Sequence, residues 1–173
     1  MSTKFRRQLT LFVEATDAAN IKQVRTQFNP VQRSLINCHV TLCREDELED
    51  LQQIMSNINT LKTSDITIHF GRPIRFAEGK GVLLPGITDN KAFHSLRKLI
   101  LQGVNDHPRK HEPHITLLHP RNSTCTDEVF SEIGELVFPS AITFKKISLI
   151  EQADLNSKWE LVQEFSLQEK HSA

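Results

Sequence analysis

Two copies of one short motif carry the side chains best suited to acid–base chemistry. The sequence reads Cys-His-Val-Thr-Leu around His39 and Pro-His-Ile-Thr-Leu around His114. Side chains alternate along a strand, so His39 shares a face with Thr41 and His114 shares a face with Thr116. The two α-carbons of each pair would lie about 6.6 Å apart, a spacing that suits contacts across one phosphate group. Two imidazoles and two hydroxyls in this pattern could take up a proton, release a proton and hold a phosphoryl group.

The repetition distinguishes the motif from a chance match. A single His-x-Thr sequence is common on half-buried strands, where both residues are structural. Two full matches among eight histidines should arise by chance in on the order of one chain in a few thousand. The alternative to catalysis at this point is a pair of unrelated structural histidines.

Hydrophobic periodicity predicts the elements that position the first motif. Leu9, Leu11 and Val13 alternate along an expected strand over residues 8–14. The following elements are, in order, a helix capped by Asp17, a loop over residues 30–34, a strand over 36–43 with the first motif, a helix starting at Asp46 and a strand over 66–70.

The second half of the chain repeats this order around the second motif. Its predicted elements are a strand over residues 81–84 ended by Pro85 and Gly86, a helix capped by Asp89, a loop over 106–112, a strand over 114–118, a helix capped by Thr126, and strands over 142–149 and 159–167. Each half therefore runs strand, helix, His-Thr strand, helix, strand.

This internal repetition predicts an α+β fold of two pseudo-symmetric lobes. Two antiparallel sheets would line a central cleft, with helices on their outer faces and one His-Thr strand in each lobe. In-line displacement at phosphorus places the entering and leaving oxygens on opposite sides, which suits one histidine on each side. At 173 residues we expect a single domain over residues 1–173.

Composition favours a globular protein with a small substrate. Hydrophobic residues make up 38% of the chain, and 21 basic side chains balance 21 acidic ones. A formal charge of zero argues against a protein that holds long nucleic acid by its phosphate backbone. The chain has no apolar run long enough for a membrane span, no pattern of a signal peptide and only three cysteines. We expect a cytoplasmic monomer with no membrane partner.

Taken together, the motifs and the order of elements resemble the two-histidine (2H) phosphoesterase superfamily, in particular its 2′-5′ RNA ligase-like branch. The resemblance rests on the His-x-Thr motifs at residues 39–41 and 114–116 and on their separation into two half-chains. It implies a bilobal fold around a groove and catalysis without a metal or cofactor. It also implies a substrate with a 2′,3′-cyclic phosphate, on a small nucleotide or an RNA end, with 2′-5′ RNA ligation as the alternative activity.

The chemistry that the resemblance implies fits these side chains. One imidazole would take a proton from water and the other would protonate the departing ribose oxygen, each step contributing about 10²–10⁴-fold in rate. We assign His114 as the base and His39 as the acid, and the pseudo-symmetry leaves the reverse assignment open. Thr41 and Thr116 would donate hydrogen bonds to the nonbridging phosphate oxygens.

Residues after the motifs are candidates for substrate binding. Many ligase-like members carry an arginine shortly after the second motif; here the continuation is Leu-His-Pro-Arg, so Arg121 follows later than in that pattern. We expect Arg121 to bind phosphate, with a solvated loop position as the alternative. His119 is a second candidate, although its strand parity points away from the cleft. Arg44 has the same parity, and we expect it to be solvated.

Few aromatic side chains are available to stack a nucleobase, and the chain has no tyrosine. Phe12 and Trp159 are the candidates. Core packing is the commoner fate of such residues and remains their alternative role.

Three other interpretations compete with acid–base catalysis. A metal hydrolase would use the histidine cluster between residues 107 and 119, but prolines disfavour the helix that a His107–His111 pair would need, and we expect no metal site. Cys43 shares the predicted face of His39 and could be a thiol nucleophile, although buried structural cysteines are commoner. The non-enzymatic alternative is a protein that only binds a nucleotide or RNA end, which would not need a matched acid and base.

Overall fold

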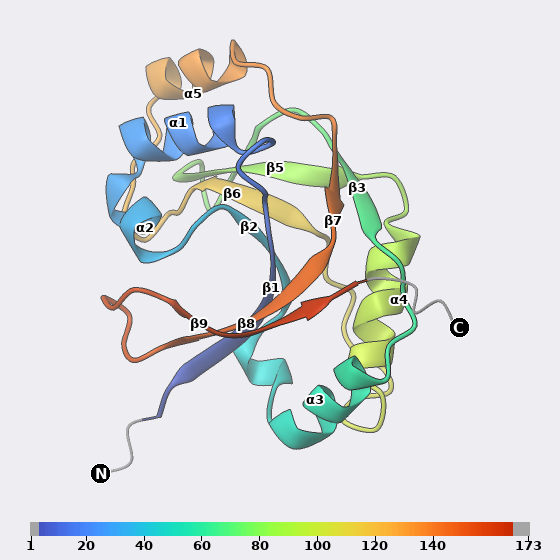
Figure 1. The fold of residues 1–173 in the computed structure, drawn as a ribbon. Helices are drawn as coiled ribbons and strands as arrows, with labels where there is room; N and C mark the ends of the chain where they lie inside the picture. The colour runs from blue at the N-terminus through green and yellow to red at the C-terminus, as the bar shows by residue number, and fades with distance from the viewer. Residues whose placement is uncertain (1–3, 168–173) are drawn as a thin grey trace.

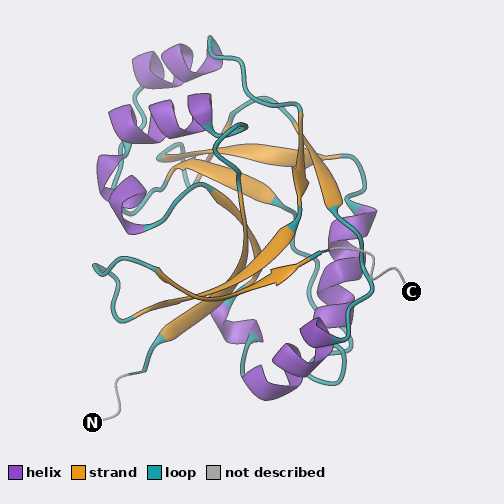
Figure 2. Cartoon of the chain, in the orientation of Figure 1, coloured by secondary structure: helices purple, strands orange, loops and turns teal. Residues whose placement is uncertain are grey.

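The computed structural model describes residues 4–167. Along this stretch the elements are β1 (Arg6–Phe12), α1 (Ala19–Phe28), α2 (Pro30–Leu35), β2 (His39–Cys43), the short 3₁₀ helix η1 (Glu45–Glu47), α3 (Leu51–Asn59), β3 (Ile66–Phe70), β4 (Ile74–Phe76), β5 (Gly81–Ile87), α4 (Lys91–Ile100), β6 (His114–Leu118), α5 (Asp127–Gly134), β7 (Ala141–Phe144), β8 (Lys146–Gln152) and β9 (Glu160–Ser166). The last helix, α5, ends at Gly134, and the rest of this stretch consists of strands and the loops between them (Figure 2). No helix within these residues is long and apolar enough to cross a membrane.

An antiparallel sheet organises the fold. Within residues 4–167 nine strands join it in the order β7-β3-β5-β6-β2-β1-β8-β9, with β4 paired to β5 outside this path. The sheet is strongly curled; α1, α2 and α5 lie together on one side of the molecule, and α3 and α4 lie together on another (Figure 1). The predicted α+β fold, with antiparallel strands and outer helices, is confirmed.

The strand order is symmetric about the contact between β2 and β6. On one side β2 pairs with β1 and β1 with β8; on the other β6 pairs with β5 and β5 with β3. The two predicted sheets are therefore continuous through the His-Thr strands. Each side also takes a strand from the other half of the chain, since β3 pairs with β5 and β8 pairs with β1. Neither half of the sequence can complete its side of the sheet alone.

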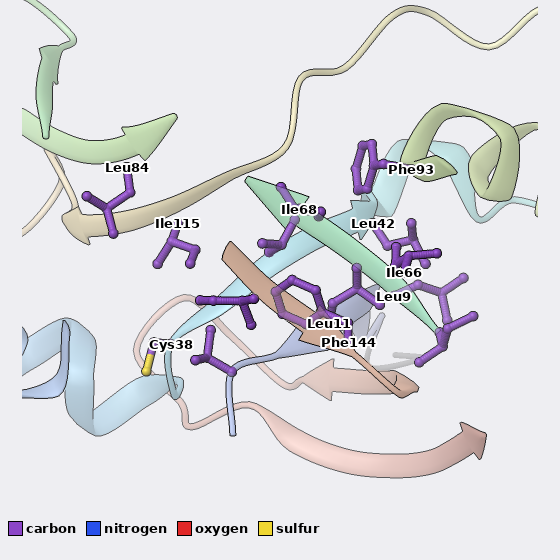
Figure 3. Close-up of a cluster of buried hydrophobic side chains, with 14 of the residues drawn as sticks. Leu9, Leu11, Cys38, Leu42, Ile66, Ile68, Leu84, Phe93, Ile115 and Phe144 are labelled. Carbon is purple, nitrogen blue, oxygen red and sulfur yellow. The ribbon is translucent and has the colours of Figure 1, made fainter. Parts of the chain in front are cut away.

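The core lies on the sheet face that the helices cover. Val40, Leu42, Ile115 and Leu117 are fully buried there, because alternate residues of β2 and β6 point to the same side. Helices α1, α3 and α4 add buried side chains to this cluster, among them Phe93 (Figure 3). Removal of this apolar surface from water is the main force that stabilises the fold.

Two predicted boundaries in the first half are wrong. Residues 30–34, predicted as a loop, belong to helix α2, which begins at Pro30. Proline suits a first helical position, because its fixed φ matches a helix and its missing N–H would be unpaired there. The helix predicted from Asp46 begins only at Leu51, where the Asp50 side chain caps it by accepting a backbone N–H hydrogen bond of 3.1 Å.

Strand β5 continues through the Pro-Gly pair that was predicted to end it. The Pro85 carbonyl accepts a hydrogen bond from the Gly71 N–H (2.9 Å), and the Gly86 N–H donates to the Pro113 carbonyl (2.8 Å). Both residues therefore keep sheet-like pairing. A Cβ on Gly86 would lie 2.8 Å from the Pro113 carbonyl oxygen, so glycine permits this close approach immediately before the second motif.

One of the three predicted helix caps is confirmed, and the other two lie one residue too early. Thr126 caps α5 as predicted, accepting a backbone N–H hydrogen bond of 3.2 Å through its hydroxyl. Asp17 and Asp89 each lie one residue farther from their helices than predicted, since Ala18 and Asn90 occupy the N-cap positions of α1 and α4.

Candidate active site

The two His-Thr strands present their motif side chains on the face opposite the core. β2 and β6 share one burial pattern, in which the histidine and threonine are half-buried and the residues between and after them are fully buried. His39 and Thr41 therefore lie on one face, and His114 and Thr116 lie on the same face of the neighbouring strand, as strand alternation predicts. β2 and β6 run side by side through the centre of the fold (Figure 1).

The histidines and threonines of the two motifs lie around one pair of opposed residues in the sheet. Val40 lies opposite Ile115 in the antiparallel pairing of β2 and β6. One step along each strand from this pair places each histidine opposite the threonine of the other motif. Directly opposed residues have Cβ atoms about 4.5–5.5 Å apart and diagonal neighbours about 7–8 Å apart. His39 and His114 are such diagonal neighbours, so the structure brings the residues of both motifs together.

The same backbone contact holds both imidazoles. His39 Nδ1 lies 2.8 Å from the Asn37 carbonyl oxygen, and His114 Nδ1 lies 3.1 Å from the Glu112 carbonyl oxygen. A carbonyl can only accept a hydrogen bond, so Nδ1 carries the proton of each neutral ring. The lone pair is then on Nε2, where it can exchange a proton with water or substrate.

Burial favours the neutral form of both imidazoles. Loss of solvent lowers the pKa of His39 to about 4, and the same effect lowers the pKa of His114 below its usual value. The carbonyl contacts act in the opposite direction, whereas the positive charges of Arg25 near His39 and Arg44 near His114 lower the pKa of each ring further. A bound anionic phosphate would raise both pKa values, because negative charge stabilises an imidazolium ion.

Two aromatic rings pack edge-on against the histidines. The ring of Phe12 lies 6.1 Å from that of His39, and the ring of His111 lies 5.9 Å from that of His114, centroid to centroid. His111 is buried, its Nε2 lies 3.0 Å from the Thr41 carbonyl oxygen, and burial lowers its pKa to about 4. From sequence His111 is a candidate only as a metal ligand; the structure shows a buried ring whose contact with Thr41 links the loop before β6 to β2.

Gln8 is a site residue that sequence reasoning missed. It lies on β1 and donates a hydrogen bond from Nε2 to Thr41 Oγ1 at 3.0 Å. β1 and β2 shift register between Leu9 and Thr10, so the partner of Gln8 could not be read from alternation. A polar residue at the start of a strand carries no signal that separates it from ordinary surface residues.

A groove of about 1140 Å³ extends from Thr41 over the neighbouring loops. Both predicted substrate-binding residues, His119 and Arg121, line this groove, as do Gln8 and Arg44. Arg44 is exposed, as expected, but it borders the groove because β2 ends one residue earlier. The remaining lining residues combine basic and acidic side chains: Lys4, Phe5, Arg6, Arg7, Glu45, Asp46, Leu48 and Glu49.

His119 adopts the opposite tautomer to the motif histidines. Its Nδ1 accepts a hydrogen bond from the Arg121 backbone N–H (3.1 Å), so the proton of the neutral ring is on Nε2. Its own backbone N–H donates to Oδ1 of the fully buried Asn29 (2.8 Å). His119 can therefore donate a hydrogen bond from Nε2 but cannot accept a proton there. Strand parity does not apply to it, since β6 ends at Leu118.

The geometry does not favour either a metal site or a thiol nucleophile. Among residues 4–167, no group of three or more His, Cys, Asp and Glu side chains is placed to hold a metal ion. Cys43 is fully buried, and burial raises the pKa of its thiol to about 12. Because the thiolate is the reactive form, Cys43 is not poised as a nucleophile.

Both aromatic candidates for base stacking border a second cavity, of about 750 Å³. Phe12, Asn37 and Trp159 line it, and the Asn37 carbonyl is the group that holds the His39 ring. The guanidinium of Arg6 lies 5.3 Å from the centre of the Trp159 ring. This cavity therefore adjoins the first motif.

Comparison with known proteins gives a family match over most of the chain. The model of the 2′-5′ RNA ligase superfamily matches residues 12–156, a range that contains both motifs. No curated protein matches the chain.

Solved structures share the fold at low sequence identity. E. coli LigT in apo form has a TM-score of 0.68 at 17% identity, over 95% of this chain and 99% of that chain. E. coli LigT complexed with 3′-AMP has a TM-score of 0.64 at 16% identity, over 94% of this chain and 98% of that chain. The protein TT0787 of Thermus thermophilus has a TM-score of 0.63 at 13% identity, over 96% of this chain and all of that chain. With the fold in agreement and the family match spanning both His-Thr strands, the chain belongs to the 2′-5′ RNA ligase superfamily, the ligase-like branch of the two-histidine phosphoesterases.

Proposed function

We propose that the protein is a metal-independent phosphoesterase that opens 2′,3′-cyclic phosphates on a nucleotide or an RNA end by acid–base catalysis. The observation that carries the proposal is the matched pair of imidazoles. His39 and His114 stand on adjacent strands, each with Nδ1 held by a carbonyl two residues earlier and with Nε2 left for proton transfer. Binding a nucleotide without turning it over would not require two rings held in the same way.

In the proposed reaction a water oxygen attacks phosphorus while one P–O bond to the ribose breaks. The neutral imidazole takes the proton of the attacking water, and the protonated imidazole gives its proton to the departing ribose oxygen. The products are a phosphomonoester and a free ribose hydroxyl. Hydroxyl protons of Thr41 and Thr116 stabilise the charge that builds on the nonbridging oxygens. Proton exchange with solvent then restores the starting state of both rings.

Burial supports His39 as the base and His114 as the acid. The pKa of His39 is lowered to about 4, whereas that of His114 is lowered less. In a singly protonated site the proton therefore resides on His114 for more of the time. This reverses the assignment made from sequence, which had no information on burial. Ligation, in which a 5′-hydroxyl group replaces water as the nucleophile, would use the same two rings in the same roles and would yield a phosphodiester and a free ribose hydroxyl.

His119 and Arg121 are the proposed substrate-binding residues. His119 presents a neutral N–H donor and Arg121 a guanidinium, and both line the groove that begins at Thr41. Guanidinium groups bind phosphate oxygens well, since their planar N–H donors match the geometry. E. coli LigT, which has this fold, has been crystallised with phosphate and with 3′-AMP, and this supports a phosphate or small nucleotide as the occupant of the site.

The test is an assay on the four nucleoside 2′,3′-cyclic phosphates and on a short RNA that ends in a 2′,3′-cyclic phosphate. We expect hydrolysis to one phosphomonoester, identified as the 2′ or the 3′ isomer by chromatography against standards. The assay is run in EDTA and then with a 5′-hydroxyl oligonucleotide added, so that a metal requirement or ligation is detected. Binding of these substrates without any product would favour the non-enzymatic alternative and contradict the proposal.

A further inference from the structure

Gln8 makes a contact that distinguishes one motif threonine from the other. Its Nε2 donates to Thr41 Oγ1 at 3.0 Å, and both side chains line the groove. Gln8 lies on β1, the strand that pairs with β2, and Phe12 of the same strand lies opposite His39. The amide thus reaches the threonine hydroxyl from the neighbouring strand.

The polarity of this contact determines where the hydroxyl proton can point. A threonine hydroxyl has one proton to donate and lone pairs that accept. The Gln8 amide occupies an acceptor position of Thr41 Oγ1, so the O–H bond must be directed elsewhere. Hydrogen bonds in such a chain polarise one another, which makes the hydroxyl a stronger donor to an anion.

The pseudo-symmetry of the sheet supplies an internal comparison. Thr10 lies opposite Thr41 and Leu83 lies opposite Thr116, and both strand pairs shift register at that point. Gln8, two residues before Thr10, therefore corresponds to Gly81, two residues before Leu83. Gly81 has no side chain, and a Cβ there would meet the Phe76 ring at 2.5 Å. The second motif cannot receive the same support from its neighbouring strand.

We infer that Gln8 is a positioning residue that turns the Thr41 hydroxyl proton toward the bound phosphate, so that Thr41 is the preorganised donor of the pair. The inference rests on the proposed function for its catalytic consequence. The hydrogen bond lowers the cost of orienting the hydroxyl during the reaction, because the donor is already aligned when charge develops. Gln8 acts only through Thr41 and itself exchanges no proton.

A double-mutant cycle tests this inference. Gln8→Met removes the amide with little change in volume, and we expect it to lower kcat/KM about tenfold. In a Thr41→Val background the same change should have less than about a twofold effect, because its only route of action is gone. In a Thr116→Val background it should still cost about tenfold. Equal effects of Gln8→Met in the two backgrounds would overturn the inference.

A second variant tests the polarity of the hydrogen bond. Gln8→Glu has the same shape but can only accept, so it draws the Thr41 proton away from the phosphate, and we expect a loss of about 100-fold. The matched control is Gln27→Glu, which adds the same charge on the exposed face of α1 and should leave kcat/KM unchanged. Wild-type activity in Gln8→Glu would show that the glutamine accepts from Thr41 and would overturn the inference.

The affinity for inorganic phosphate, measured by calorimetry, separates failure of this inference from failure of the proposed function. If the wild-type protein hydrolyses no cyclic phosphate, the proposed function is wrong, but the same cycle can be read in the phosphate Kd. We then expect Gln8→Met to weaken phosphate binding in the wild-type and Thr116→Val backgrounds and not in the Thr41→Val background. Additive effects on the Kd, or no phosphate binding at all, would overturn the inference. Melting temperatures of all variants establish that each is folded.

Discussion

Val40 lies directly opposite Ile115 in the pairing of β2 with β6, and this relationship organises the candidate site. Because the strands are antiparallel, the two motifs run past each other, and each histidine comes to lie across from the threonine of the other motif. The buried pair anchors this arrangement from the core side, where both residues are inaccessible to solvent. The histidines and threonines thus project from one face of β2 and β6, and the buried core residues project from the opposite face of the same two strands.

Replacing either motif histidine should abolish most turnover of 2′,3′-cyclic phosphates. We expect His39→Ala and His114→Ala each to reduce kcat by about 10²–10⁴-fold, the usual contribution of one acid or base. His69→Ala, on the exposed face of β3, is the matched control and should retain full activity. Steady-state kinetics measure the effect, and circular dichroism checks the fold. Wild-type kcat in either motif variant would refute the acid–base roles.

The pH dependence of kcat/KM should be bell-shaped and displaced to acid. The active form has one neutral and one protonated imidazole, and burial lowers the pKa of His39 to about 4 and also lowers that of His114. The singly protonated form is therefore most populated between about pH 4 and the pKa of His114, which lies below its usual value near 6.5, and kcat/KM should fall as the pH rises above this window. A maximum above pH 7 would contradict this expectation.

Arg44 should control the alkaline limb of that profile. After burial, its positive charge is a further cause that lowers the pKa of His114. Arg44→Met removes the charge, so the pKa of His114 should rise and the alkaline limb should move to higher pH. Arg72→Met, at another exposed position, is the control and should leave the profile in place. An unchanged alkaline limb in Arg44→Met would show that another group titrates there.

The residue behind the site should be a major determinant of stability. Ile115→Ala removes a fully buried side chain from the cluster in Figure 3 and should lower the free energy of unfolding by about 2–5 kcal/mol. Val137→Ala, at a position with 80% exposure, should change it by less than about 0.5 kcal/mol. Urea denaturation followed by circular dichroism measures both. Equal midpoints for the two variants would place Ile115 outside the core.

A buried ion pair links η1 to α4, and we expect it to contribute to the stability of the fold. The side chains of Glu47 and Arg97 are 7% and 2% exposed, and Arg97 Nη2 lies 2.7 Å from Glu47 Oε2. Glu47→Ala leaves the guanidinium buried without its partner, so the free energy of unfolding should fall by about 3–5 kcal/mol. Asp127→Ala breaks the exposed pair with Arg75 and should have a much smaller effect. Equal losses in the two variants would contradict the role assigned to the buried pair.

The same pair should make stability depend on pH. Burial acts to raise the pKa of Glu47, but the hydrogen bonds and charge of Arg97 outweigh it, and the pKa is lowered from 4.5. A lowered pKa in the folded state stabilises the protein above about pH 4.5, and this contribution is lost as the pH falls through the folded-state pKa. The difference between wild type and Glu47→Ala should therefore shrink in acid. A constant difference down to pH 3 would argue against ionised Glu47 as its source.

Local pattern predicted the elements around the site well, and its failures have physical causes. β6 was predicted residue for residue, since an apolar-rich run bounded by Pro113 and Pro120 leaves little freedom in its ends. Residues 30–34 were predicted as a loop but form helix α2. Proline is compatible both with the end of one helix and with the first position of the next, so Pro30 alone did not distinguish the two. The Pro85-Gly86 pair predicts the end of a strand, and only the tertiary structure shows that the Pro85 carbonyl still accepts a hydrogen bond, from the Gly71 N–H that follows β3.

The sequence by itself determined which side chains can do chemistry. A repeated His-x-Thr pattern in two apolar runs specifies two faces, each with an imidazole and a hydroxyl, because strand geometry has a period of two. Only the tertiary structure decided what surrounds them. The tautomers of His39, His114 and His119, the lowered pKa values and the amide of Gln8 on Thr41 all depend on groups distant in sequence or on chain turns. The tautomers follow from backbone groups two residues away, whose orientation the hydrophobic pattern does not encode. The burial and the Gln8 contact arise only when the strands of the described residues assemble into one sheet.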